Sequence, residues 1–166
     1  LRPDVQVIPC GLHVDEVVAA ARQKPERPAA PIVYAGRLQD NKRIDLLLHS
    51  IARLSRPGLL LSIFGAGPER PRLERLAAEL GLGGRVEFRG LVRTSRELWS
   101  ALATAQLAVQ PSEREGFGLF PLEAMALGLP VVYCESPESA VGELVRDGRE
   151  GIASEPDAKA LARALE

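Results

Sequence analysis

Cysteine is scarce in this sequence, with Cys10 and Cys134 the only two among 166 residues. Two cysteines are too few for a disulfide framework, and neither stands in the Cys-x-x-Cys or Cys/His spacing of a metal site. We therefore expect both to be small buried side chains in a reducing cytosol. Long apolar runs are lacking as well, since none approaches the roughly 18 residues that a membrane-spanning helix needs.

The chain also lacks an excess of charge of either sign. It carries 21 basic and 22 acidic residues, a formal net charge of -1. No global field therefore favours nucleic acid or an anionic membrane, and any anion site must be local. With 46% apolar and 26% charged residues, the composition predicts one globular domain over residues 1–166. The opening residues lack a secretory signal pattern, so we expect a cytoplasmic location.

Several motifs of metal and nucleotide sites are missing. There is no Asp-x-Asp pair and no cluster of carboxylates with histidine, so we expect no dedicated metal site. No Walker motif and no Gly-x-Ser-x-Gly elbow occurs. The segment Gly65-Ala66-Gly67 lacks the third glycine of a dinucleotide fingerprint, whose position Arg70 occupies. We expect a tight turn there, which lets the backbone approach a ligand or a neighbouring loop closely.

From Ile32 onward, short apolar segments rich in β-formers alternate with longer segments of helical period. This alternation predicts a Rossmann-like, doubly wound α/β fold, a parallel sheet of about six strands with helices on both faces. We expect Pro68 at the first position of one helix and Ser95 as the N-cap of another. The expected strands are 31–36, 59–64, 85–88, 107–109, 131–134 and 151–153, and the expected helices are 44–54, 68–80, 95–103, 120–127, 138–145 and 158–165. A first short strand at 5–9 and a charged, proline-rich linker at 22–31 precede them.

The loop that follows the first strand of this periodic part carries two cations, Arg37 and Lys42. Ligands of such sheets bind at the carboxyl ends of the strands, where two cations can clamp a phosphate or a diphosphate. An ordinary solvated connection between a strand and a helix often carries two cations as well. The loop alone therefore leaves both interpretations open.

The loop after residues 107–109 supplies carboxylates. Glu115 precedes the turn, and we place Glu123 in the first turn of the next helix, where the helix dipole favours a carboxylate by about 0.3 to 1 kcal/mol. The free amides of Gly118 and Leu119 at the helix N-terminus offer an anion site. Because carboxylates suit vicinal hydroxyls and amides suit phosphate, the two loops together predict a hydroxylated anion as the ligand.

Four segments of the chain, residues 7–12, 35–42, 61–68 and 115–123, carry a family resemblance. In this order, they resemble the C-terminal, donor-binding half of a GT-B fold glycosyltransferase of family 4, the group 1 glycosyl transferases. The most specific of them is the segment with the paired glutamates, whereas the Gly-x-Gly turn alone is a weak signal. A fifth segment, at 85–90, extends the resemblance to nearly the whole chain.

The resemblance implies retaining, metal-independent transfer of a hexose from a UDP- or GDP-linked donor, which is a substrate, so that no cofactor is needed. It implies that Arg37 and Lys42 contact the diphosphate and stabilise the leaving nucleotide, and that Glu115 holds the hydroxyls of the donor sugar. Glu123 would contact the ribose, and Leu91 and Val92 would flank the base. The full set of implied donor-binding residues beyond the three catalytic ones is Gly36, Gly65, Gly67, Leu91, Val92, Gly116, Phe117, Gly118, Leu119 and Glu123.

Two segments depart from the family pattern, since Cys10 stands where the family often has Asn and Ser139-Ala140 replaces a usual Gly-Gly pair. By comparison with the family pattern, we expect the N-terminal, acceptor-binding half to be absent from this chain. We therefore expect this chain to bind a nucleotide sugar but to transfer nothing alone. Membrane contact, at the inner face, would arise only through the missing half.

The alternative is a noncatalytic, flavodoxin-like nucleotide-binding or signalling module built on the same kind of sheet. A receiver domain would need acidic residues clustered after the early strands. Here the first loop is cationic at Arg37 and the second, Gly65-Ala66-Gly67, is neutral, which disfavours this alternative.

Overall fold

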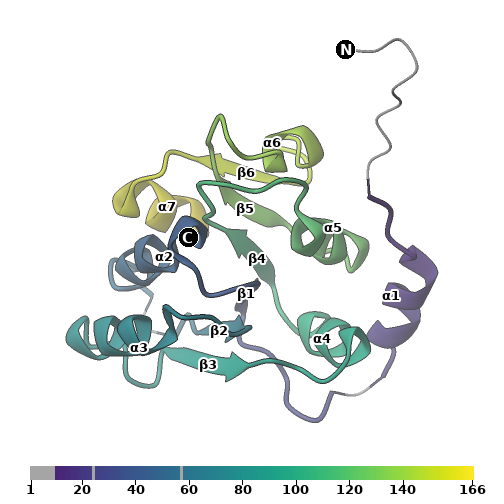
Figure 1. Ribbon diagram of the computed structural model, residues 1–166, viewed down its shortest axis with the longest axis horizontal. Coiled ribbons are helices and arrows are strands. Elements are labelled where there is room, and N and C mark those ends of the chain that lie inside the picture. The colour runs from purple at the N-terminus through teal and green to yellow at the C-terminus, as the bar shows by residue number, and fades with distance from the viewer. Residues whose placement is uncertain (1–9, 24, 57) are drawn as a thin grey trace.

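The structure is a computed structural model that describes residues 10–23, 25–56 and 58–166. Within these residues the strands form one parallel sheet in the order β3-β2-β1-β4-β5-β6 (Figure 1). The predicted doubly wound α/β fold is thereby confirmed. The strands are β1 (Ile32–Ala35), β2 (Leu61–Phe64), β3 (Val86–Gly90), β4 (Leu107–Gln110), β5 (Val131–Cys134) and β6 (Gly151–Ser154).

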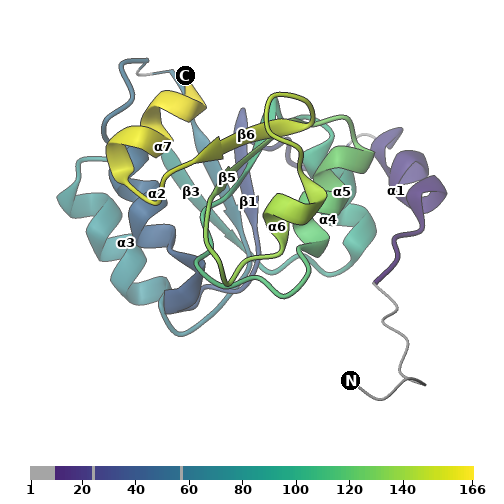
Figure 2. The same cartoon turned by 90° about the horizontal axis from the view of Figure 1, so that it is seen from above.

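Helices cover both faces of this sheet. Figure 2 shows α2, α3 and α7 on one side, and α4, α5 and α6 on the other with α1 outside them. The helices are α1 (Val14–Ala21), α2 (Ile44–Ile51), α3 (Arg70–Glu79), α4 (Ser95–Leu102), α5 (Leu119–Ala126), α6 (Val141–Leu144) and α7 (Ala158–Leu165), and a 3-10 turn, η1 (Asp40–Lys42), precedes α2.

The side chains of β1 show how this sequence forms two cores. Ile32 and Tyr34 point into the core beneath α2, α3 and α7, and Val33 and Ala35 point into the core beneath α4, α5 and α6. Successive residues of a strand face opposite sides, so a strand covered on both faces needs an uninterrupted apolar run. All residues of β1 are buried accordingly.

The N-terminal part differs from the prediction. The strand expected at 5–9, and with it residues 7–9 of the segment 7–12 that resembles the family, lies outside the described residues. Helix α1 was not predicted. Its buried residues Val17 and Ala20 pack on Trp99 of α4, and Asp15 and Glu16 stand in its first turn, a helix start signal that sequence reasoning missed.

Three helix starts also need correction. Helix α3 begins at Arg70 rather than at Pro68, with Pro71 in its first turn. Thr94 rather than Ser95 caps α4, since its side chain accepts a hydrogen bond from Glu97 N. Helix α6 is much shorter than the 138–145 predicted, because Ser139 forms a parallel bridge with Glu115. The backbone groups beside Ser139 are therefore engaged with the β4 loop instead of a helix.

The strand order fixes where a ligand of this fold belongs. The order runs outward in opposite directions from the pair β1 and β4, which makes that pair the topological switch point. A flavodoxin-like sheet has the order 2-1-3-4-5, so the alternative predicted from the sequence does not match this topology. The loops that follow β1 and β4 are the two that carry Arg37, Lys42 and Glu115.

Candidate functional site

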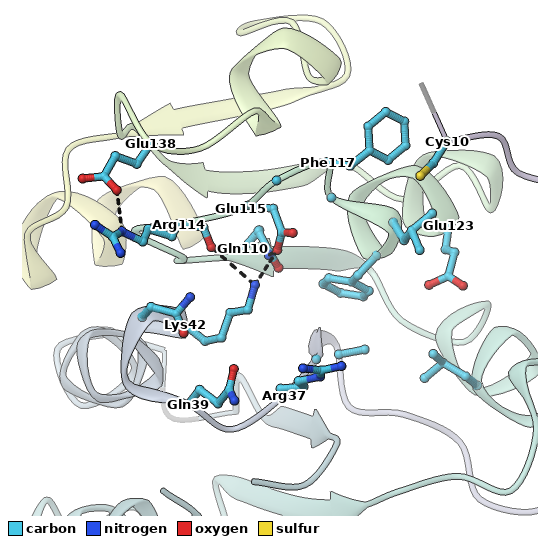
Figure 3. Close-up of a pocket in the computed structure, with 18 residues that line it drawn as sticks. Cys10, Arg37, Gln39, Lys42, Gln110, Arg114, Glu115, Phe117, Glu123 and Glu138 are labelled. Atoms are coloured by element: carbon cyan, nitrogen blue, oxygen red, sulfur yellow. Dashed lines mark hydrogen bonds and ion pairs between the residues drawn. The ribbon is translucent and has the colours of Figure 1, made fainter. Parts of the chain in front are cut away.

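A cavity of about 1070 Å³ lies at the carboxyl ends of β1 and β4. The β1 loop bounds it on one side, and the β4 loop with the start of α5 bounds it on the other (Figure 3). Most of the residues predicted for the site line it. They are Gly36, Arg37, Lys42, Glu115, Gly116, Phe117, Gly118, Leu119 and Glu123, joined by Cys10, Gln39, Asn41, Gln110, Arg114 and Glu138 among others.

Lys42 and Glu115 meet across this cavity. The ammonium Nζ of Lys42 lies 2.7 Å from Glu115 Oε2, and it also donates to the carbonyl of Arg114 at 3.4 Å. Lys42 is the last residue of the 3-10 turn, and Arg43, which takes a left-handed conformation with φ of 49°, connects this turn to the start of α2. Arg37 is exposed at the same cavity. The structure thus brings the cations and the first predicted carboxylate together.

The backbone of Glu115 is held as firmly as its side chain. Its N–H donates to Glu138 O at 3.2 Å, and its carbonyl accepts from Ala140 N at 2.8 Å. The Ser139-Ala140 segment, which departs from the family pattern, therefore anchors the β4 loop through main-chain groups. Arg114 and Glu138 add an ion pair between the two loops.

Gln110 is a site residue that sequence reasoning missed. It ends β4, is only 3% exposed and donates from Nε2 to Glu115 Oε2 at 2.8 Å. A signal was present, since an amide at the carboxyl end of an apolar strand has no packing reason to be there. The expected strand ended one residue earlier, at 109, so Gln110 was left in the loop.

The start of α5 presents backbone amides to the cavity. Gly118 stands before the helix in the left-handed region, with φ of 89°. The first intrahelical bond joins Leu122 N to Gly118 O at 3.3 Å, so the N–H groups of Gly118, Leu119 and Phe120 precede it. A helix N-terminus with such free amides favours an anion.

Glu123 is placed differently from the prediction. Helix α5 begins at Leu119 and has no acidic residue in its first turn, so Glu123 lies in the second turn, where the dipole no longer explains it. Trp99 Nε1 donates to Glu123 Oε1 at 2.9 Å instead. Burial raises the pKa of the Glu123 carboxyl, and the Trp99 hydrogen bond lowers it by less.

A second, apolar cavity of about 240 Å³ adjoins the first and shares Ala35, Gly36 and Arg37 with it. Leu91, Val92 and Gly65 line it. Gly67, the remaining predicted donor residue, lines neither cavity. It packs against the β1 loop, where a Cβ on Gly67 would lie 2.1 Å from Leu38 O. The tight turn expected at Gly65–Gly67 therefore serves the close approach of a neighbouring loop.

The two cysteines differ from one another. Cys134 is buried as expected, and burial raises the pKa of its thiol to about 12. The expectation was wrong for Cys10, which is exposed and lines the main cavity. Among residues 10–23, 25–56 and 58–166, no three His, Cys, Asp or Glu side chains are grouped as a metal site would require. In the same residues, no helix combines the length and the apolar character needed to cross a membrane.

A doubly wound sheet with a cationic loop, two carboxylates and a helix N-terminus at its switch point places the chain in the class of Rossmann-like domains, whose ligands bind at that point of the sheet. A family model described as glycosyl transferases group 1 matches residues 29–166, and the chain belongs to this family of GT-B fold glycosyltransferases.

Two curated relatives illustrate the match. LpsE of Rhizobium meliloti, a lipopolysaccharide core biosynthesis glycosyltransferase, is 37% identical over 166 residues that cover 98% of this chain and 47% of that protein. The D-inositol 3-phosphate glycosyltransferase of Nocardioides sp. is 39% identical over 157 residues that cover 83% of this chain and 33% of that protein. The chain therefore spans between a third and a half of the length of these relatives.

Two solved structures resemble this chain in fold and in sequence. Sucrose-phosphate synthase from Thermosynechococcus elongatus is 31% identical with a TM-score of 0.78, over 96% of this chain and 42% of that one. Anabaena HepE, solved in complex with UDP and glucose, is 26% identical with a TM-score of 0.72, over 81% of this chain and 37% of that one.

Proposed function

We propose that this chain binds the nucleoside diphosphate sugar donor of a retaining, metal-independent glycosyltransferase. One observation carries the proposal. At the switch point, a single cavity gathers the cations Arg37 and Lys42, the amides at the start of α5, and the carboxylates Glu115 and Glu123. A diphosphate between two hydroxylated groups is the ligand whose chemistry matches all of these.

The diphosphate takes the positive part of the site. Lys42 and Arg37 approach it from the β1 loop, and the amides of Gly118 and Leu119 approach it from α5. When the bond to the sugar breaks, negative charge grows on the leaving nucleotide. Preorganised cations and amides stabilise that charge, which is how they lower the barrier without a metal ion.

The carboxylates take the hydroxyls on either side of the diphosphate. Glu115 accepts hydrogen bonds from the sugar, with the amides of Gly116 and Phe117 beside it, and Glu123 accepts them from the ribose. The adjoining apolar cavity at Leu91 and Val92 takes the flat faces of the base. Gly36 and Gly65, which also line that cavity, leave room for the nucleotide against the backbone.

Transfer requires an acceptor site in addition to this donor site. We propose that an acceptor-binding domain completes the enzyme on the N-terminal side, in the cytoplasm, and that any membrane contact belongs to that domain. The donor is a substrate, and no cofactor takes part. UDP-linked hexoses are the first donors to test, because HepE was solved with UDP and glucose, and GDP-linked hexoses are the second.

Titration calorimetry with UDP, GDP and ADP, and with UDP-glucose, GDP-mannose and ADP-glucose, tests the proposal on this chain. We expect saturable binding of one of the three nucleotides and of its sugar conjugate. Glu123→Ala should weaken this binding about 10-fold or more, because a hydrogen bond to a charged group is lost. Glu79→Ala is the matched control, since Glu79 is exposed on α3 and should leave the affinity unchanged. Failure of all six compounds to bind the wild-type chain would refute the proposal.

A further inference from the structure

Gln110 has an unusual position for an amide. It is the last residue of β4 and 3% exposed, yet it lines the main cavity. Its Nε2 group has two hydrogens, and both are used: one bond reaches Ser112 Oγ at 3.0 Å and the other reaches Glu115 Oε2 at 2.8 Å.

These two bonds fix which way the amide points. With the amide reversed, Oε1 of Gln110 would face the Glu115 carboxylate, and two acceptors would oppose each other. In the orientation observed, Oε1 is buried and has no hydrogen-bond partner among the described residues. Burying an amide with its oxygen unpaired costs free energy, so Gln110 is poorly explained by its contribution to stability. Its contact with Glu115 is a better explanation.

Both side-chain hydrogen bonds to Glu115 end on the same carboxylate oxygen, Oε2. Lys42 Nζ lies 2.7 Å from Oε2, and Gln110 Nε2 lies 2.8 Å from it. The two donors differ in kind, because Lys42 is a mobile cation that a diphosphate attracts strongly, whereas Gln110 is neutral and enclosed by the core. Once a diphosphate draws Lys42 toward itself, Gln110 is the donor that still holds the carboxylate.

We infer that Gln110 is a positioning residue that keeps the Glu115 carboxylate aimed at the donor sugar while Lys42 engages the diphosphate. Gln110 itself touches no part of the donor. The bond to Ser112 Oγ fixes the amide of Gln110, and the bond to Glu115 holds Oε2 of that carboxylate, so that Oε1 of Glu115 is the oxygen presented to the sugar hydroxyls. The inference rests on the proposed function, since it assigns the sugar to Glu115, and it adds a residue that acts through Glu115.

The test compares the affinity for a nucleotide sugar with the affinity for the bare nucleotide, using UDP-glucose against UDP and GDP-mannose against GDP. Gln110→Met keeps the length and bulk of the side chain but removes the donor. We expect it to weaken binding of the sugar nucleotide about 10-fold and to leave binding of the bare nucleotide unchanged. Gln106→Met is the matched control, because Gln106 is exposed just before the same strand.

A double-mutant cycle separates positioning from a general disturbance of the site. If Gln110 acts through Glu115, Gln110→Met should have no further effect on sugar affinity in a Glu115→Ala background, which lacks the acceptor of the Gln110 bond. Thermal unfolding should show Gln110→Met folded, with a midpoint close to that of the wild-type chain. Gln110→Asn, which shortens the amide, should not restore the sugar affinity.

The outcomes distinguish the two proposals. If no nucleotide binds the wild-type chain, the proposed function fails and this inference fails with it. If nucleotides bind but Gln110→Met leaves the ratio of the two affinities unchanged, or changes it equally in both Glu115 backgrounds, only the role of Gln110 is refuted.

Discussion

Trp99 of α4 donates its indole N–H to the carboxylate of Glu123 on α5, with 2.9 Å between Nε1 and Oε1. The same indole packs against Val17 and Ala20 of α1. Trp99 therefore connects the outermost helix with the main cavity, which Glu123 lines. It is also the only tryptophan of the chain, so its fluorescence reports on this one position.

A UDP titration should change the emission of Trp99, because a ribose that bonds to Glu123 alters the polarity around the indole N–H. Fluorescence spectroscopy measures the saturation curve, and its midpoint should equal the dissociation constant from calorimetry. Free N-acetyl-tryptophanamide, titrated in parallel, corrects for light absorbed by the nucleotide. Saturable binding in the calorimeter with no change of emission would contradict a ribose contact at Glu123.

The raised pKa of Glu123, caused first by burial, predicts a pH dependence of stability. The folded chain holds this proton more tightly than the unfolded chain, so protonation favours folding. That contribution is present at acid pH and is lost as pH rises from the ordinary value of a glutamic acid through the raised folded value. Glu123→Gln removes the ionisation and should have a higher thermal midpoint than wild type at pH 8.

The comparison needs measurements on both sides of this window. At acid pH, where Glu123 is protonated in both states, the midpoints of Glu123→Gln and wild type should converge. Glu79→Gln, on an exposed glutamate, should differ from wild type by the same small amount at both pH values. A Glu123→Gln advantage that did not grow with pH would rule out burial as the cause.

The sequence predicted most elements because their patterns are local. Strand β5 and helix α7 have the predicted bounds, 131–134 and 158–165. The short apolar run after Pro130 and the helical period after Asp157 can both be recognised without a distant partner. The shortening of α6 was not predictable in this way. It depends on the pairing of Ser139 with Glu115, and only the folded chain brings these segments together.

The parts of the site whose positions follow from the sheet topology could be predicted from the sequence. Residues after β1 and β4 must share an edge of the sheet, so Lys42 and Glu115 could be assigned to one site without a structure. Their ion pair spans 73 residues, and no sequence pattern specifies it. The support that Gln110 and Trp99 give the two glutamates was missed for the same reason, because it depends on which side chains face each other after folding.

Lys42→Ala should slow glycosyl transfer about 100- to 1000-fold in an enzyme that joins this chain to its acceptor-binding half, the usual cost of removing one preorganised donor. The effect should fall on kcat, since the proposed role of Lys42 is to stabilise charge that grows on the leaving diphosphate. Steady-state kinetics measure it. Lys159→Ala, on an exposed lysine of α7, is the control and should be neutral. Near-normal turnover of Lys42→Ala would remove Lys42 from the mechanism.

The two cysteines should react at very different rates with iodoacetamide at pH 8. Cys134 is buried and the pKa of its thiol is raised to about 12, so almost none of it is the reactive thiolate. Cys10 is exposed and should be alkylated first. Mass spectrometry of peptides should find one label per native chain and two after unfolding in guanidinium.

The same labelling reaction tests where the nucleotide binds. Since Cys10 lines the main cavity, saturating UDP should slow its labelling. Equal rates with and without bound UDP would place the nucleotide away from Cys10.

Gly67 packs against the β1 loop, and replacing it should lower the stability of the fold. A Cβ there would lie 2.1 Å from Leu38 O, and the same carbonyl accepts Glu69 N at 3.1 Å, so the β1 loop cannot retreat without breaking that bond. Gly67→Ala should lower the free energy of unfolding by about 1 to 3 kcal/mol, as overpacking does. Gly83→Ala is the matched control, because nothing lies within 4 Å of its Cβ position, and it should be neutral or stabilising by up to about 1 kcal/mol. Urea denaturation measures both, and equal stability of the two variants would show that the β1 loop can move to accommodate a methyl group at Gly67.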